Sequence, residues 1–134
     1  METFILNEDI KVFILTAESF PDGILDAHQK LHAIVPFSED RRYFGISRPE
    51  NNIITYKASS EELENEEGKY DLESFIIKKG RYISLTISGY MNDEQAIGKA
   101  FQKLLSYPEL DPNGYCIEWY LNDDDVRCMI RLED

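Results

Sequence analysis

Hydrophobic residues change their spacing several times along the chain, and these changes predict short strands and two helices. Residues Ile10 to Phe20 mix β-branched and aromatic side chains, and Pro21-Asp22-Gly23 ends the run, which predicts a strand followed by a turn. From Ile24 to Val35 the apolar residues recur roughly every 3.6 positions, and Pro36 follows them. This segment is the first predicted helix.

Two strand-like segments and an acidic stretch come next. Arg41 to Ser47 and Asn52 to Ser59 flank Arg48-Pro49-Glu50-Asn51, whose proline and asparagine are typical of a turn, so we expect a hairpin. The stretch Glu61 to Lys69 is acidic and contains a glycine. It is predicted to be a loop or short irregular helix that connects the two halves of the chain.

The second half of the chain repeats this order of elements. Leu72 to Lys78 and Arg81 to Tyr90 are extended segments around a glycine, and an apolar stripe from Ile97 to Leu105 predicts the second helix. The last predicted strands are Tyr115 to Leu121 and Val126 to Leu132. Each half thus runs strand, helix, strand, strand. We expect residues 1 to 134 to form a single α+β domain, an antiparallel sheet with two helices on one face.

The polar turn Asn122 to Asp125 sets the predicted register of the last hairpin. A symmetric loop of these residues places Leu121 opposite Val126 and Glu118 opposite Met129. One face is then almost continuously apolar and is expected to lie under a helix. It would carry Tyr115, Ile117, Trp119, Leu121, Val126, Cys128, Ile130 and Leu132. The other face would carry Cys116, Glu118, Tyr120, Arg127, Met129 and Arg131.

The second face of this hairpin places the carboxylate of Glu118 beside a tyrosine and a methionine. A carboxylate with apolar neighbours is costly to desolvate and needs a cation, a hydrogen-bond donor or a proton. Two interpretations stay open: Glu118 lines a half-dry cavity, or it is a surface acid paired with Arg127 or Arg131. In the predicted register, the alternation of side chains places Cys116 and Cys128 on opposite faces, so we expect reduced thiols without a disulfide.

Tyrosines are further candidates for ligand contact. Alternation along Arg81 to Ser88 places Tyr82 on a polar face, opposite a face formed by isoleucines and a leucine. In the first half of the chain, Tyr43 and Tyr56 are candidates to line the same concavity. Each of these two could equally be a rim or core tyrosine.

Composition narrows the classes of partner. The chain has 26 acidic and 14 basic residues, a formal net charge of −12, which repels a phosphate backbone, so we expect no direct nucleic-acid binding. No apolar run approaches the roughly 20 residues of a membrane-spanning helix. The N-terminus lacks the pattern of a secretory signal, so we expect a cytoplasmic protein without a membrane segment. His28 and His32 share a helix face but have no third ligand nearby in sequence, so no metal or cofactor is expected.

Four short segments occur in a characteristic order along the chain. They are Tyr43-Phe44-Gly45-Ile46-Ser47, Ile77-Lys78-Lys79-Gly80-Arg81-Tyr82, Ala100-Phe101-Gln102-Lys103-Leu104-Leu105 and Cys116-Ile117-Glu118-Trp119-Tyr120. In this order they resemble the GyrI-like family, also called the effector-binding domain of drug-sensing bacterial transcription activators. The resemblance runs from about residue 10 to the C-terminus.

This resemblance implies two pseudo-twofold strand-helix-strand-strand units, with the helices on one side of the sheet and a ligand cleft at the junction. In the family, a glutamate within a Glu-x-Tyr pattern on the penultimate strand is the acid at the base of the cleft, and it corresponds here to Glu118 with Tyr120. Aromatic residues around it accept planar, often cationic compounds. Some relatives instead hydrolyse electrophilic compounds with this glutamate. The family pattern continues into an apolar residue and a proline, whereas Leu121-Asn122 follows here.

We therefore expect a stand-alone small-molecule-binding domain, without a DNA-binding module, that senses or sequesters a partly apolar ligand. The resemblance implies that this ligand can also be cationic. The expected ligand contacts are Glu118, Tyr120, Tyr82, Tyr43, Tyr56 and Met129. Two alternatives stay open. Glu118 could be the base or nucleophile of a hydrolase that acts on electrophilic small molecules. The acidic exterior could also engage a basic protein partner, as the topoisomerase-inhibitor members of the family suggest.

Overall fold

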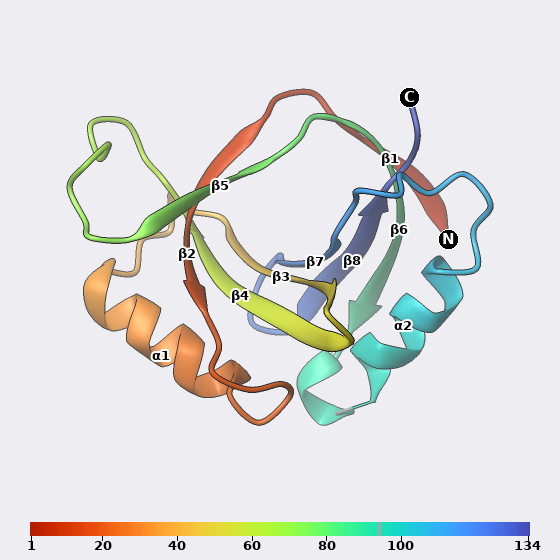
Figure 1. Ribbon diagram of the computed structural model, residues 1–134, viewed down its shortest axis with the longest axis horizontal. Coiled ribbons are helices and arrows are strands. Elements are labelled where there is room, and N and C mark those ends of the chain that lie inside the picture. The colour runs from red at the N-terminus through yellow and green to blue at the C-terminus, as the bar shows by residue number, and fades with distance from the viewer. Residues whose placement is uncertain (94) are drawn as a thin grey trace. The chain divides into compact units, whose positions relative to one another are not determined.

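The computed structural model describes residues 1–93 and 95–134, which fold into two compact units (Figure 1). Unit 1 consists of Met1–Asp9 and Lys78–Asp134, and unit 2 of Ile10–Ile77. Each unit combines antiparallel strands with one α-helix, which confirms the predicted α+β class. Among the described residues, no helix combines the length and the apolar character that crossing a membrane requires.

Unit 2 contains the first predicted helix and the strands around it. Its elements are β2 (Ile10–Thr16), α1 (Ile24–Ile34), β3 (Tyr43–Glu50), β4 (Ile53–Glu61) and β5 (Glu73–Ile77), with the strands in the order β3-β4-β2-β5. The apolar stripe of α1 packs against β2 and β4. The buried core between them consists of Phe13, Ala27, Leu31, Val35, Tyr56 and Ala58.

Unit 1 is built in the same way around the second helix. Its elements are β1 (Glu2–Leu6), β6 (Gly80–Ser88), the short 3₁₀ helix η1 (Tyr90–Asn92), α2 (Ala96–Leu104), β7 (Cys116–Tyr120) and β8 (Asp125–Arg131). The strand order is β1-β6-β8-β7, and α2 packs against β6 and β8. The buried core consists of Ile83, Ala100, Phe101, Leu104, Val126, Cys128, Ile130 and Leu132.

The two units therefore share one topology, a strand-helix-strand-strand order with an additional strand beside the first one. The additional strand is β5 in unit 2, where it pairs with β2, and β1 in unit 1, where it pairs with β6. The repeated order of elements was predicted, but β1 was not. Each additional strand leads directly into the first strand of the other unit, so the chain passes between units at Asp9 and again at Ile77.

The hairpin of unit 2 extends further than predicted. β3 continues through Pro49 to Glu50, and the turn falls at Asn51 and Asn52, whose φ angles are 53° and 67°. Asparagine tolerates this left-handed region, which two-residue hairpin turns require. The predicted turn at Arg48 to Asn51 was therefore wrong, because the proline marked the end of a strand and not the turn itself.

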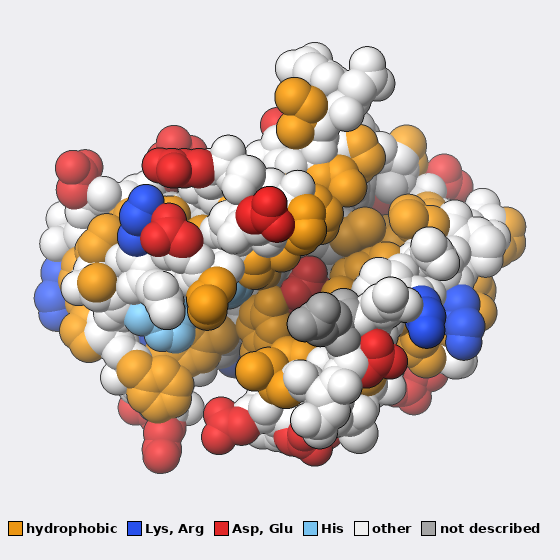
Figure 2. Space-filling view, turned by 90° about the horizontal axis from the view of Figure 1, so that it is seen from below, with side chains coloured by type: hydrophobic (Ala, Val, Ile, Leu, Met, Phe, Trp, Pro, Cys, Tyr) orange, Lys and Arg blue, Asp and Glu red, His pale blue; other side chains and the backbone are white. Residues whose placement is uncertain are grey.

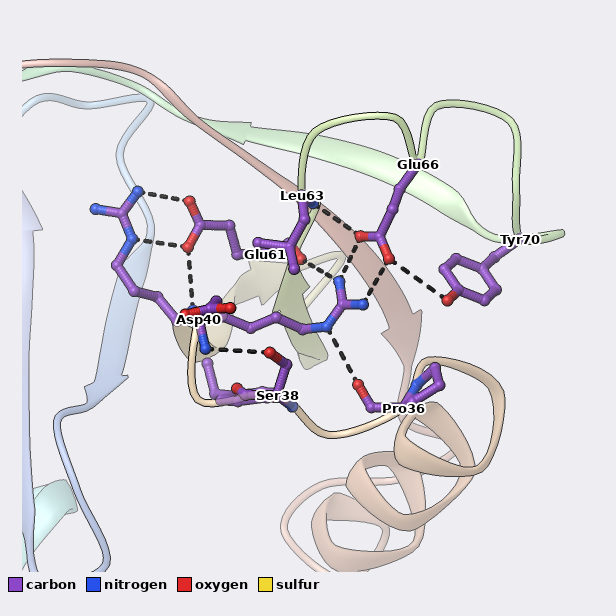
Figure 3. A network of polar contacts seen from close by, with 10 residues as sticks. Pro36, Ser38, Asp40, Glu61, Leu63, Glu66 and Tyr70 are labelled. Carbon is purple, nitrogen blue, oxygen red and sulfur yellow. Dashed lines mark hydrogen bonds and ion pairs between the residues drawn. The ribbon is translucent and has the colours of Figure 1, made fainter.

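The acidic stretch after β4 lies within unit 2, where it joins β4 to β5, so its predicted role as the connector between the halves was wrong. Arg41 holds it in place. Its guanidinium donates to both carboxylate oxygens of Glu66, at 2.5 and 2.6 Å, and to the carbonyl oxygen of Pro36 at 3.2 Å (Figure 3). Glu66 also accepts the backbone N–H of Leu63 at 2.8 Å. The hydrogen bond from Arg41 lowers the pKa of the Glu66 carboxyl to about 2.

Most acidic side chains lie at the surface of the described residues, in contact with water. Acidic side chains are scattered among hydrophobic ones on the face that Figure 2 shows, and Asp123 and Asp124 in the turn between β7 and β8 are exposed. Within the described part of the chain, only Glu66 and Glu118 are buried acids. One of them has an arginine partner and the other does not.

We expect Glu66→Gln to lower the free energy of unfolding by about 3 kcal/mol near neutral pH, because it leaves the Arg41 charge buried without its counterion. The folded pKa of Glu66 lies below its ordinary value of 4.5, so its contribution is present above that value and is lost as the pH falls towards about 2. Urea unfolding at several pH values measures both effects. Glu67→Gln, at a side chain that is 87% exposed, is the matched control and should change stability by less than about 0.5 kcal/mol. Equal effects of the two substitutions would contradict the role of the pair.

Candidate functional site

The strand pair β7 and β8 positions Glu118, and its register differs by one residue from the predicted one. Tyr120 lies opposite Val126, and Glu118 lies opposite Cys128. The predicted pairing of Glu118 with Met129 was therefore wrong.

A shorter turn causes this difference. The N–H of Leu121 donates to the carbonyl of Asp125 at 3.0 Å, so the loop proper is Asn122 to Asp124. The side-chain oxygen of Asn122 accepts the backbone N–H groups of Asp124 and Asp125 at 2.8 and 2.9 Å. Asparagine bonds the backbone beyond it in this way at many tight turns, and the bonds fix a loop one residue shorter than the symmetric one.

A shift of one residue moves every side chain of one strand to the other face. The predicted helix face of β8 is confirmed, because Val126, Cys128 and Ile130 belong to the core under α2. Their partners on β7 are Tyr120, Glu118 and Cys116, in that order. Glu118 thus shares the face that α2 covers, and the prediction that Ile117 and Trp119 occupy this face was wrong.

Glu118 is a buried acid without a cation. The residue is 8% exposed, and the hydroxyl of Tyr120 donates to its Oε1 at 2.6 Å. Among the residues that the structure describes, no lysine or arginine forms an ion pair with it. Burial raises the pKa of the carboxyl to about 7, although the hydrogen bond from Tyr120 acts in the opposite direction. The carboxyl therefore changes charge near neutral pH.

Two thiols lie on the same face as this carboxyl. Cys128 is directly opposite Glu118, and Cys116 is two residues before it on β7, so the prediction that the cysteines occupy opposite faces was wrong. Both are free cysteines. Burial, together with the charge of Glu118, raises the pKa of Cys116 to about 11 and that of Cys128 to about 12. Both are neutral at physiological pH, and they surround the acid as small polarisable side chains and not as nucleophiles.

Tyr90 is a further neighbour that sequence reasoning missed. It follows Gly89, whose φ of 70° ends β6, and it begins η1. Its ring centroid lies 5.9 Å from that of Tyr120. Burial raises the pKa of the Tyr90 hydroxyl, and the charges of Asp123 and Glu118 add to the effect. The predicted strand ran to Tyr90, and the glycine before it was the one signal that the chain turns there.

Tyr82 and Met129, two of the predicted ligand contacts, lie on the other face of unit 1 from Glu118. Met129 pairs with Ile117 and is fully buried. Tyr82 is 1% exposed, and its hydroxyl donates to the carbonyl of Lys78 at 2.5 Å. Strand alternation separates both side chains from the carboxyl of Glu118.

Tyr43 and Tyr56, the other predicted contacts, belong to unit 2. Tyr56 is buried on the α1 face, and its hydroxyl lies 2.8 Å from Nε2 of His28. It also covers Gly45, where a Cβ would fall 2.1 Å from the hydroxyl oxygen, so only glycine fits there. The ring of Tyr43 stacks on that of Phe37 with centroids 5.4 Å apart.

The two histidines of α1 contact the tyrosines of unit 2, His28 the ring of Tyr56 and His32 the ring of Tyr43. Burial, with a smaller effect of His32, lowers the pKa of His28 to about 4, so His28 is neutral and hydrogen-bonded to Tyr56. Within residues 1–93 and 95–134, no three His, Cys, Asp or Glu side chains converge in a way that could hold a metal ion. The best candidate for a functional site among the described residues is therefore the group formed by Glu118, Tyr120, Tyr90 and the two thiols.

Comparison with known proteins shows the fold. No protein-family model matches the chain, and no curated protein sequence does. Among solved structures, an integron cassette protein from the mobile metagenome of Vibrio cholerae is similar, with a TM-score of 0.71, 13% identity, and coverage of 98% of this chain and 95% of that one. A hydrolase from Listeria innocua is also similar, with a TM-score of 0.62, 10% identity, and coverage of 98% and 90%. At these identities the likeness concerns architecture alone.

The buried carboxyl should leave a signature in the pH dependence of stability. The folded pKa of Glu118, about 7, lies above its ordinary value of 4.5, so its contribution is fully present below that value and is lost as the pH rises through about 7. Relative to Glu118→Gln, the parent should therefore lose on the order of 3 kcal/mol of stability between about pH 4 and about pH 9. Urea unfolding of both proteins across this range measures the difference.

The control for this measurement is Glu73→Gln, at an exposed acid on β5. Its stability should follow the parent at each pH. A constant difference between the parent and Glu118→Gln over the whole range would show that the carboxyl has no raised pKa.

Proposed function

We propose that the chain is a small-molecule-binding domain in which Glu118 anchors a partly apolar, cationic ligand. The contrast between the two buried acids carries this proposal. Glu66 has Arg41 at 2.5 Å, whereas Glu118 has one hydrogen bond, from Tyr120, and no cation among the described residues. A buried carboxyl that lacks a counterion has an unsatisfied preference for positive charge, which a cationic ligand would meet.

The neighbours of Glu118 are consistent with a ligand that also has an apolar surface. The rings of Tyr90 and Tyr120 lie 5.9 Å apart and offer aromatic faces, and the thiols of Cys116 and Cys128 are neutral. Aromatic faces attract cations, and aromatic and thiol groups pack well against planar rings. This combination agrees with the resemblance to the GyrI-like family, whose Glu-x-Tyr pattern corresponds to Glu118 and Tyr120.

Protonation of Glu118 should oppose the binding of a cation. With a pKa of about 7, the carboxyl is partly protonated at neutral pH, and a cationic ligand binds best to the ionised form. The affinity should therefore increase as the pH rises through about 7, and binding near that pH should release protons. A neutral ligand of the same shape lacks this dependence.

The dye pair 9-aminoacridine and acridine tests the proposal, because the first is cationic and the second largely neutral at neutral and mildly alkaline pH. We expect 9-aminoacridine to bind the parent more tightly at about pH 8 than at about pH 6. Glu118→Gln should weaken its binding roughly tenfold or more at the higher pH, while acridine binding changes little. Fluorescence anisotropy measures the affinity of each dye for the parent and for Glu118→Gln. Glu73→Gln is the control for loss of an exposed charge, and equal affinity of the parent and Glu118→Gln for the cation would contradict the proposal.

A second function, hydrolysis of an electrophilic small molecule, is favoured by the same pKa. A general base is most effective when its pKa lies near the working pH, and Glu118 meets this condition. The hydroxyl of Tyr120, 2.6 Å from Oε1, would orient the carboxylate. In this role Glu118 accepts a proton from water while the water oxygen forms a bond to the electrophilic carbon. The bond from that carbon to the leaving group then breaks, the leaving group departs as an anion, and Glu118 returns its proton to the leaving group or to solvent.

With 4-nitrophenyl acetate as the electrophile, a hydrolase should show a rate that rises through about pH 7. Glu118→Gln should lower that rate roughly a hundredfold or more, because an amide cannot accept the proton. Tyr120→Phe should keep activity and move the midpoint of the pH profile upward, since it removes the bond that lowers the pKa of Glu118. Identical rates for the parent and Glu118→Gln would exclude the catalytic role.

A further inference from the structure

Arg127 occupies an unusual position on the face of unit 1 opposite Glu118. It lies directly across from Trp119 in the pairing of β7 and β8. Its guanidinium carbon lies 4.3 Å from the ring centroid of Phe4 and 5.1 Å from that of Trp119. The two rings meet edge to face, with centroids 5.8 Å apart. We call Phe4, Trp119 and Arg127 the aromatic corner, which three strands, β1, β7 and β8, assemble.

The guanidinium of Arg127 has no anionic partner within the described residues. The Nε atom is fully buried and has no hydrogen-bond acceptor. Among the described residues the two terminal nitrogens have no acceptor either, and the residue as a whole is partly exposed, so these nitrogens, unlike the buried Nε, are the part of the group that a ligand could contact. Two of the three nitrogens are therefore accessible from solvent, in a group whose position is fixed by aromatic contacts.

Every other arginine of the chain lies within ion-pair distance of a carboxylate. The pairs are Arg41 with Glu66, Arg42 with Glu61, Arg48 with Glu50, Arg81 with Glu109, and Arg131 with Asp111. With 26 acidic residues in the chain, a carboxylate could easily have been placed beside Arg127 as well. Arg127 has no carboxylate partner among the described residues and is held by two rings, so its terminal nitrogens can donate to an oxyanion from outside the protein.

We propose that the aromatic corner is a binding site for a small oxyanion, a carboxylate or a phosphate group, on a molecule with an apolar body. The terminal nitrogens of Arg127 donate to two oxygens of the anion, since a guanidinium matches both groups in this bidentate way. The rings of Phe4 and Trp119 contact the apolar part of the same molecule. The net charge of −12 disfavours anions at long range, but salt screens that repulsion beyond roughly 8 Å at physiological ionic strength.

Trp119 is the one tryptophan of the chain, so its indole N–H gives a single NMR signal that reports on this site. Sodium benzoate, sodium acetate and sodium phosphate are titrated into the intact protein at constant ionic strength, with chloride as the balancing salt. We expect a saturable shift of the indole signal with at least one of the three anions. Tighter binding of benzoate than of phosphate identifies a carboxylate ligand, and the reverse order identifies a phosphate ligand.

Substitutions separate an anion site from a purely structural arginine. Arg127→Met should abolish the saturable shift, and Arg127→Lys should weaken binding roughly tenfold, because an ammonium lacks the bidentate geometry. Arg81→Met removes a charge from an exposed position in the same unit and should leave the shift unchanged. Absence of a saturable shift in the parent, or an equal shift in Arg127→Lys and the parent, overturns the proposal. Glu118→Gln should bind these anions like the parent, so failure of this site leaves the proposed function of Glu118 unaffected.

Discussion

The burial of one carboxyl without a cation is the interaction on which this account depends. Glu118 lies on the face that α2 covers, it is 8% exposed, and the Tyr120 hydroxyl is its one hydrogen-bond donor within the described residues. Removing a carboxylate from water costs several kcal/mol unless a partner compensates, and here the compensation is partial. The result is a group that accepts a proton near neutral pH and favours a positive charge. Its position next to aromatic rings and neutral thiols is the basis for proposing a small, partly apolar molecule as the ligand.

The scaffold explains how a sequence tolerates such a group. Glu118 is one polar position on a strand face that otherwise belongs to the core under α2. The members of this core come from β6, α2 and β8, with Leu132 just after β8. This core fixes the strand on which the carboxyl lies, and it leaves only 8% of the residue exposed. Unit 2 has the same topology, but its face under α1 carries Tyr56 over Gly45, with His28 as the hydrogen-bond partner. The face under the helix therefore carries a buried carboxyl in unit 1 and a tyrosine–histidine hydrogen bond in unit 2.

Much of this fold follows from pattern alone, and the exceptions have local causes. Both helices were predicted because their apolar residues have helical spacing, and Pro36, two residues after the end of α1, marks where the first helix stops. β1 was missed because it is short and pairs with β6, about 80 residues later, so nothing nearby in sequence marks it. The turn of the first hairpin was placed too early because two asparagines with positive φ, and not Pro49, make the turn.

The candidate site was predicted in part. Glu118 and Tyr120 were identified together, and the structure joins them by a hydrogen bond. Their face was wrong because the side chain of Asn122 shortens the loop by one residue, and periodicity along the strands cannot detect that change. For the same reason the thiols of Cys116 and Cys128 were placed apart, and Met129 was placed beside the acid. The position of Tyr90 was missed because only a single glycine marks the end of β6 before it. The surroundings of Arg127 were missed because its ring contact with Phe4 comes from β1, the strand that the pattern did not predict.

The most direct test of the central claim is the pKa of Glu118 itself, measured by side-chain ¹³C NMR of glutamate-labelled protein, with Glu118→Gln to assign the signal. If burial raises the pKa of Glu118, its carboxyl signal titrates near pH 7 and moves to higher pH in Tyr120→Phe. A signal that titrates at the ordinary value of 4.5 in both proteins would show that the carboxyl is solvated, and the account would then be wrong.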